Sequence, residues 1–176
     1  MNAGLDLLAQ ISPRYGIDIK RLALLGLSAG GHLAALAAFA RREAGFGSPP
    51  GIKIRAVVYS YGPSNLITHC AGKTGILATS VTQLLGHSVF AMPAAAFRAS
   101  PVAYCNPDSP PFLLNHGDED TVVPVTKSYS FQAQLAAAGG AAQVIHIPGG
   151  GHATPNMYTE DIHTRIIDFI DRHLAD

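Results

Sequence analysis

The chain has 176 residues, of which 48% are apolar and 14% are charged. This length and composition predict one compact domain with a sizeable core, rather than two domains or a disordered tail. Twelve basic residues balance twelve acidic ones, so the formal net charge is zero. A neutral chain creates no long-range field toward nucleic acid or an anionic membrane, and we expect neither as a partner.

The cysteines and the first residues bear on the cellular compartment. Cys70 and Cys105 are too few for a disulfide-stabilised secreted domain, so we expect free thiols. Residues 1–10 contain Asp6 and no basic group, and no apolar run approaches the length of a membrane span. Nothing marks export, which predicts a cytoplasmic protein without a membrane-spanning segment.

The start of the chain predicts a helix, a strand and a second helix. Residues 5–11 are rich in Ala and Leu and predict a helix that ends at Pro13 or frays toward Gly16. Residues 22–25 form a short apolar run closed by glycine, which is typical of a parallel strand buried on both faces. Residues 30–40 are apolar on nearly every side and predict a buried helix.

The rest of the chain repeats this alternation. Three short apolar runs, each ending near glycine or proline, predict strands at residues 56–59, 111–115 and 144–147. Residues 126–138 predict a helix that stops at Gly139-Gly140. An apolar stripe of helical period predicts the last helix, with the members Ile162, Ile166, Ile167, Ile170 and Leu174. Strands that alternate with helices predict an α/β fold, with a mostly parallel sheet covered by helices on both faces.

Residues 62–104 interrupt the alternation. They are rich in Gly, Ser, Thr and Pro, and only residues 81–85 and 94–98 show a short helical pattern. We expect an irregular, lid-like excursion from a single domain that spans residues 1–176.

The pattern Gly26-x-Ser28-x-Gly30 lies directly after the first predicted strand and directly before a predicted helix. This is the arrangement of a nucleophile elbow, in which a tight turn lifts a serine hydroxyl out of the sheet. Both glycines are expected to lie against neighbouring backbone, where a side chain would collide. The alternative for Ser28 is a helix N-cap serine, but the preceding strand and both glycines favour a nucleophile.

A serine hydroxyl is a poor nucleophile at neutral pH, so it needs a base, and the base needs an orienting acid. Asp120 follows the third predicted strand, 92 residues after Ser28, and His152 follows the fourth, 32 residues further on. All three candidates therefore follow the carboxyl ends of parallel strands, where an open α/β sheet places its site. Asp118 competes with Asp120 as the acid, and a solvated loop histidine is the alternative for His152.

Three segments carry a resemblance to a known family, namely residues 24–36, 111–124 and 147–152. They are similar to α/β-hydrolase esterases and lipases related to the hormone-sensitive-lipase type. They more closely resemble the acetyl- and feruloyl-ester hydrolases often encoded beside polysaccharide-degrading enzymes. The resemblance implies the C-terminal part of an α/β-hydrolase fold.

The matching positions imply roles for individual residues. Ser28 matches the family's serine in Gly-x-Ser-Ala-Gly-Gly-His, and Asp120 matches the aspartate three residues after the glycine of His-Gly. His152 matches the histidine that closes Pro-Gly-x-Gly-His. The resemblance thus implies a serine carboxylesterase without a cofactor, acting on short acyl esters or on acetyl and feruloyl groups of carbohydrates. A serine peptidase of the prolyl-oligopeptidase type shares these motifs, but such proteins carry a propeller domain of which this sequence has no trace.

One departure from the family limits these expectations. The family has about four strands and a His-Gly-Gly-Gly-type loop before the helix with which this chain begins. An oxyanion hole takes one N–H from the residue after the nucleophile, here Ala29, and a second from that earlier loop. Losing one donor costs on the order of 10² to 10³ in turnover. We therefore expect a weakened enzyme, or else a non-catalytic hydrolase remnant that acts as a binding or oligomer-forming module.

The same departure predicts an interaction surface. In the family, the strand at residues 22–25 pairs on one side with a strand that this chain lacks. An unpaired apolar edge recruits other strands, so we expect a homo-oligomer that forms through this edge.

The remaining histidines and Tyr61 are weaker candidates. His32 lies one turn after Ser28 on a buried helix, where we expect a hydrogen-bonded core residue rather than a catalytic one. Tyr61 ends the second predicted strand, a position that suits lining a pocket and packing equally. The other histidines share no metal-ligand spacing, so we expect no zinc site; they are His69, His87, His116, His146, His163 and His173.

Overall fold

The computed structural model describes residues 2–39, 51–73 and 76–175. In these residues the centre is a four-stranded parallel sheet with the order β1-β2-β3-β4. The strands are β1 Leu22–Leu27, β2 Ile54–Ser60, β3 Phe112–Gly117 and β4 Ala142–Ile147. The four predicted strands are confirmed, with ends that differ by at most two residues.

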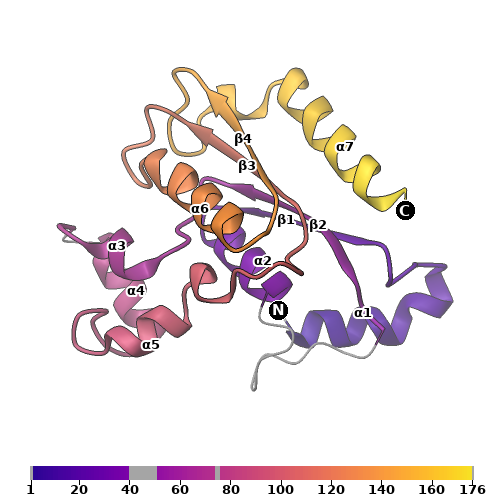
Figure 1. The fold of residues 1–176 in the computed structure, drawn as a ribbon, viewed down its shortest axis with the longest axis horizontal. Helices are drawn as coiled ribbons and strands as arrows, with labels where there is room; N and C mark the ends of the chain where they lie inside the picture. The colour runs from indigo at the N-terminus through magenta and orange to yellow at the C-terminus, as the bar shows by residue number, and fades with distance from the viewer. Residues whose placement is uncertain (1, 40–50, 74–75, 176) are drawn as a thin grey trace.

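Helices cover both faces of this sheet (Figure 1). α2 Ala29–Phe39 and α6 Thr126–Ala137 pack on one face, and α7 Glu160–Leu174 packs on the other. The predicted α/β fold with helices on both faces is confirmed. No helix in the described part of the chain is both long and apolar enough to cross a membrane.

The face under α2 and α6 has an aromatic core. Phe39 from α2 stacks on Phe112 from β3 with 4.9 Å between ring centroids, and Phe131 from α6 meets both rings edge-on. All three side chains are buried, and each such burial stabilises a fold by about 1.5–3 kcal/mol. This packing holds α2, and with it the turn that precedes α2, against the sheet.

Strand β1 differs from its expectation of burial on both faces. Leu25 and Leu27 are 54% and 42% exposed, whereas Ala23 on the same face packs against the core under α7. Among the described residues β1 has a strand neighbour only in β2. The expectation was therefore wrong for the second half of β1, because an edge strand has fewer elements around it than a central one.

Helix α1 Asn2–Tyr15 continues through Pro13. Of the two ends expected from the sequence, the later one, toward Gly16, is therefore the observed one. Pro13 has no N–H to donate to the Ala9 carbonyl, which would be its helical partner. The Ser12 hydroxyl donates to that carbonyl instead, at 3.0 Å. The helix then ends at Tyr15, because the next residue, Gly16, has a φ of +64°, which is incompatible with a further helical turn.

The stripe that predicted α7 is only partly buried. Ile162 and Phe169 are buried and Ile166 and Ile170 pack beside them, but Ile167 is 56% exposed. Phe169 therefore takes the place that the sequence pattern assigned to Ile167. Its aromatic ring also packs edge-on against His173 one turn later.

The described residues between 62 and 104, called the cap segment below, are largely helical rather than irregular. They form α3 Leu66–Cys70, α4 Ile76–Leu85, α5 Pro93–Arg98 and the 3-10 helix η2 Pro101–Tyr104. The three α-helices group at one end of the sheet, far from α1 (Figure 1). Residue Asn65 begins α3, because its side chain accepts the N–H groups of Ile67 and Thr68. That N-cap was readable in the sequence and was missed.

Both cysteines are free thiols, as expected. Cys70 is buried at the end of α3, and Cys105 follows η2. Burial raises the pKa of the Cys105 thiol to about 11. At neutral pH this thiol is protonated, which makes it a weak nucleophile.

Candidate active site

The carboxyl ends of the four strands meet at one edge of the sheet and carry the candidate residues. Ser28 follows β1, Tyr61 follows β2, Asp120 lies beyond β3 and His152 lies beyond β4. The structure joins three of them in one hydrogen-bonded chain. Ser28 Oγ lies 2.9 Å from His152 Nε2, and His152 Nδ1 lies 2.7 Å from Asp120 Oδ2.

The partners of His152 define its tautomer. A carboxylate oxygen only accepts hydrogen bonds, so His152 Nδ1 carries the proton and donates a hydrogen bond to Asp120. In the neutral ring, Nε2 then presents its lone pair to the Ser28 hydroxyl. The His152 side chain is 20% exposed, whereas the Asp120 side chain is fully buried. The His152 imidazole is therefore accessible to a small molecule, and the Asp120 carboxyl group is shielded from water.

The backbone of Ser28 has the strained conformation of a nucleophile elbow, with a φ of +52°. Residues other than glycine rarely adopt this left-handed region, and those that do concentrate at functional sites. The Ser28 N–H donates to the Ser60 carbonyl at 2.9 Å, and the His32 N–H donates to the Ser28 carbonyl at 3.2 Å. Hydrogen bonds on both sides thus hold the turn in place.

The two glycines of the elbow differ in their surroundings. A Cβ at Gly26 would lie 2.1 Å from the carbonyl oxygen of Gly30, so a larger residue does not fit. A Cβ at Gly30 would meet nothing within 4 Å. The expectation that both glycines lie against backbone is correct for Gly26 and wrong for Gly30. Gly30 is in the first turn of α2, and the position that a side chain would occupy there is open space.

Ala29 is the first residue of α2. The first N–H groups of a helix have no acceptor inside the helix, and they lie at the positive end of its dipole. The Ala29 N–H is therefore a donor suited to negative charge, directly beside Ser28.

Asp120 is held by its own loop. Its Oδ1 accepts the N–H groups of Val122 and Val123 at 2.9 and 2.8 Å, which leaves Oδ2 for His152. The two oxygens thus have separate tasks, since one anchors the loop and the other orients the imidazole.

His116 is a part of this site that sequence reasoning missed, because it was considered only as a metal ligand. It is fully buried on β3, with Nε2 2.6 Å from the Val123 carbonyl and Nδ1 2.7 Å from Ser128 Oγ. The carbonyl only accepts, so Nε2 carries the proton and Nδ1 accepts from Ser128. Desolvation lowers the pKa of His116 and keeps it neutral. The available signal was a histidine within a buried apolar strand, directly before Gly117.

Asp118 lies two residues from Asp120 but does not contact His152. Its Oδ1 accepts the Gly149 N–H at 2.7 Å, and its Oδ2 lies 3.1 Å from His146 Nε2. The hydrogen bond from Gly149 lowers the pKa of this exposed carboxyl. Asp118 therefore ties the end of β3 to the loop that carries His152.

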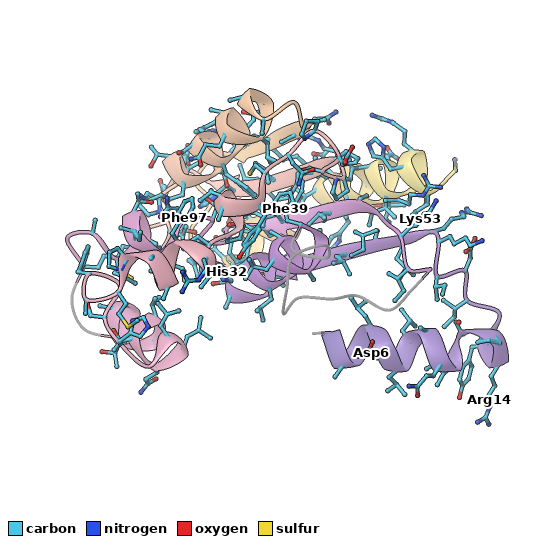
Figure 2. All side chains as sticks on the ribbon, turned by 60° about the horizontal axis from the view of Figure 1, so that its bottom comes forward. Asp6, Arg14, His32, Phe39, Lys53 and Phe97 are labelled. Carbon is cyan, nitrogen blue, oxygen red and sulfur yellow. The ribbon has the colours of Figure 1, made fainter. Side chains whose placement is uncertain are left out.

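The cap segment is attached to the elements that surround Ser28. His32 is 4% exposed, and its Nδ1 lies 2.8 Å from the Pro63 carbonyl. Figure 2 shows His32 on α2, on the side where the cap segment meets this helix. Lys73 Nζ donates to the Val122 carbonyl, and Lys127 Nζ donates to the carbonyl of Thr68 at 3.0 Å. His32 is thus a hydrogen-bonded core residue, which agrees with the expectation from the sequence.

The histidines considered as zinc ligands do not gather in the structure. In the described ranges no group of three or more His, Cys, Asp or Glu side chains could hold a metal ion. His69 is instead buried on α3, and its Nδ1 has no hydrogen-bond partner. Burial, together with the charges of Lys73 and Lys127, lowers the pKa of His69 to about 4.

A parallel sheet with a strained serine elbow after one strand, and an aspartate and a histidine after two others, defines the α/β-hydrolase class. The chain belongs to the BD-FAE family, whose sequence model matches residues 1–135. This match includes Ser28 and Asp120, whereas His152 lies beyond it.

Relatives of known sequence and structure have related names. The esterase LipQ of Mycobacterium tuberculosis is 31% identical over 146 residues, which cover 79% of this chain and 34% of LipQ. A truncated carbohydrate esterase from gut microbiota superposes with a TM-score of 0.86 at 26% identity, covering 99% of this chain and 67% of that one. A bifunctional GH43-CE protein of Bacteroides eggerthii superposes with a TM-score of 0.85 at 27% sequence identity, covering 98% of this chain and 24% of that one. The chain spans about a third of the length of the curated relatives it matches.

Proposed function

We propose that this chain carries the nucleophile, base and acid of a carboxylic ester hydrolase. The observation that carries this proposal is the continuous contact from Ser28 through His152 to Asp120, with distances of 2.9 and 2.7 Å. The names of LipQ, an esterase, and of the gut carbohydrate esterase support the same reaction class.

The first half of the reaction transfers the acyl group to the protein. Ser28 Oγ attacks the acyl carbon of the ester while His152 Nε2 takes the hydroxyl proton. The Ala29 N–H donates to the carbonyl oxygen as that oxygen becomes negative. The bond to the alkoxy oxygen then breaks, His152 returns its proton to that oxygen, and the alcohol leaves. Asp120 keeps its hydrogen bond from His152 Nδ1 and stabilises the imidazolium that forms in between.

The second half restores the enzyme with water. His152 Nε2 takes a proton from a water molecule, whose oxygen attacks the acyl carbon bound to Ser28. The new tetrahedral centre collapses, the bond to Ser28 Oγ breaks, and the proton from His152 returns to the serine. The balance is one ester and one water consumed, and one acid and one alcohol formed, with no cofactor involved.

We further propose short acyl esters, including acetyl or feruloyl groups on carbohydrates, as the substrates. The support is the name of the gut carbohydrate esterase, which has 26% sequence identity and a TM-score of 0.86. A series of p-nitrophenyl esters of increasing acyl length, assayed beside acetylated xylan, tests this. A rate that rises with acyl length, with no acetate released from xylan, would contradict it.

Labelling with a fluorophosphonate tests the catalytic proposal directly. A serine that is hydrogen-bonded to a neutral imidazole reacts with this reagent, so we expect label on the wild-type chain and none on Ser28→Ala. Failure of the correctly folded wild-type chain to react would refute the hydrolase. It would favour the alternative of a non-catalytic binding module.

A further inference from the structure

Tyr61 has a strained backbone beside the candidate active site. In the part of the chain that the structure describes, positive φ angles outside glycine occur at Ser28, Tyr61 and Ala153. All three lie around His152. Ser28 is hydrogen-bonded to His152, Ala153 follows it in the chain, and the Tyr61 ring contacts its imidazole. A left-handed conformation at such a residue is strained and persists where surrounding contacts impose it. Contacts of the Tyr61 side chain are therefore expected to hold its backbone at the φ of +40°.

The Tyr61 ring forms one wall for the His152 imidazole. The two ring centroids are 4.9 Å apart, and their planes meet at 70° in an edge-to-face contact. Tyr61 itself is only 2% exposed and packs in the core under α7 with Leu113 and Ile145. A ring fixed in this way restricts the rotation of the imidazole that lies against it.

The Tyr61 hydroxyl reaches the segment that follows His152. It lies 2.5 Å from the hydroxyl of Tyr158, the last residue of the 3-10 helix η3 Pro155–Tyr158. Burial raises the pKa of Tyr61, so its phenol is protonated throughout the neutral range. Met157, next to Tyr158, is buried in the same core as Tyr61. The chain after His152 is thus anchored to the carboxyl end of β2.

The chain before His152 is anchored independently. Asp118 accepts the Gly149 N–H at 2.7 Å, and the Gly151 N–H donates to Thr154 Oγ1 at 2.8 Å. These bonds shape the loop, but neither reaches the imidazole ring. Besides its hydrogen bonds with Ser28 and Asp120, the imidazole has an edge-to-face contact with the Tyr61 ring.

We propose that Tyr61 is a positioning residue for the base of this site. Its ring sets the orientation of the His152 imidazole, and its hydroxyl, through Tyr158, holds the loop that carries His152. The proposal rests on the hydrolase proposed above. Tyr61 exchanges no proton with the substrate and acts only through His152, so its loss reduces turnover without removing the reaction.

The variants Tyr61→Phe, Tyr158→Phe and the double variant test the hydroxyl contact. One hydrogen bond of this kind corresponds to about a threefold to tenfold change in rate. We expect each single variant to lower kcat by that factor with KM unchanged, and the double variant to match the single ones. Tyr61→Leu, which also removes the ring, should lose more. The matched control is Tyr104→Phe, which removes a hydroxyl that donates to the Arg98 carbonyl at 2.6 Å in the cap segment.

A structural role is separated from a positioning role by counting active sites. Fluorophosphonate titration gives the fraction of molecules with an intact site, and kcat is then expressed per titrated site. A residue that merely supports folding lowers the fraction and leaves the kcat per site unchanged. Wild-type kcat per site in Tyr61→Phe and Tyr158→Phe, or effects that add in the double variant, would overturn the proposal. Tyr158 is 38% exposed, so its variant remains informative if Tyr61 variants fold poorly.

A second readout is independent of activity. The proton that His152 Nδ1 shares with Asp120 gives a proton NMR signal far downfield, which broadens when the imidazole becomes mobile. We expect a sharp signal in the wild type and in Tyr104→Phe, and a broadened one in Tyr61→Phe and Tyr158→Phe. An unchanged signal in both would refute positioning by Tyr61. A wild type without esterase activity but with this NMR pattern would refute the hydrolase and leave the positioning role standing.

Discussion

Asp120 Oδ2 lies 2.7 Å from His152 Nδ1, and the Asp120 side chain is fully buried, whereas Asp118, two residues earlier, is exposed and bonds to Gly149. The two aspartates are alike in sequence context but have different partners, because the turn after β3 directs one carboxylate inward and the other toward the loop after β4. Two matched substitutions distinguish their roles.

Asp120→Asn should lower kcat/KM on p-nitrophenyl acetate by a factor of about 10⁴. A loss of this size is typical when the aspartate of a serine-protease triad is replaced by asparagine. An amide no longer selects the tautomer in which Nε2 faces Ser28. Asp118→Asn keeps an oxygen for the Gly149 N–H and should lose no more than about tenfold, which corresponds to one hydrogen bond. Equal losses in both variants would show that the acid is wrongly assigned.

Gly26→Ala should destabilise the fold by at least about 2 kcal/mol, because a Cβ cannot lie 2.1 Å from a carbonyl oxygen without moving the backbone. Gly30→Ala is the matched control in the same motif. Its Cβ has open space, and alanine in a helix is more stable than glycine by about 1 kcal/mol. Urea unfolding at neutral pH measures both values. A stable Gly26→Ala protein would contradict the observed elbow geometry.

His69→Leu should reduce the acid sensitivity of the fold. The pKa of His69 is about 4 in the folded protein, below its ordinary value of 6.5. Between these two values the unfolded chain binds a proton that the folded protein excludes, so stability falls as the pH falls from about 6.5 to about 4. Its Nδ1 has no partner, so at pH 7.5 the variant should be as stable as the wild type or more so.

Thermal unfolding at pH 7.5 and pH 5 measures this effect. We expect Tm to fall by a smaller amount between these pH values in His69→Leu than in the wild type. Some acid sensitivity should remain, because desolvation also lowers the pKa values of His32 and His116. Parallel Tm curves for the two proteins would show that His69 does not titrate as described.

Leu25→Lys should reduce self-association. Leu25 is 54% exposed on β1, which stands at the edge of the described sheet, and a lysine on an edge strand opposes pairing with another copy. Light scattering over a range of concentrations should show wild-type oligomers that become smaller in the variant. Leu84→Lys, at a position on α4 that is also exposed, at 63%, controls for the added charge. A monomeric wild type would contradict the predicted homo-oligomer.

The sequence by itself determined the secondary structure of the sheet and the identity of the three residues that the structure joins. Apolar runs such as residues 22–25 and 144–147 are local signals, because the pattern lies in residues that are adjacent in the sequence. The elbow pattern and the order Ser28, Asp120, His152 were likewise visible without coordinates. Asn65 shows that a local signal can also be overlooked, since its N-cap needed only the sequence.

The tertiary structure alone decided which side chains meet. The contact of Tyr61 with His152 and the hydrogen bond between Ser28 and His152 join residues that are up to 124 positions apart in the chain. The exposure of Leu25 and Leu27 depends in the same way on which elements lie beside β1. Such contacts are set by the packing of helices and strands in three dimensions, and spacing along one chain does not encode them.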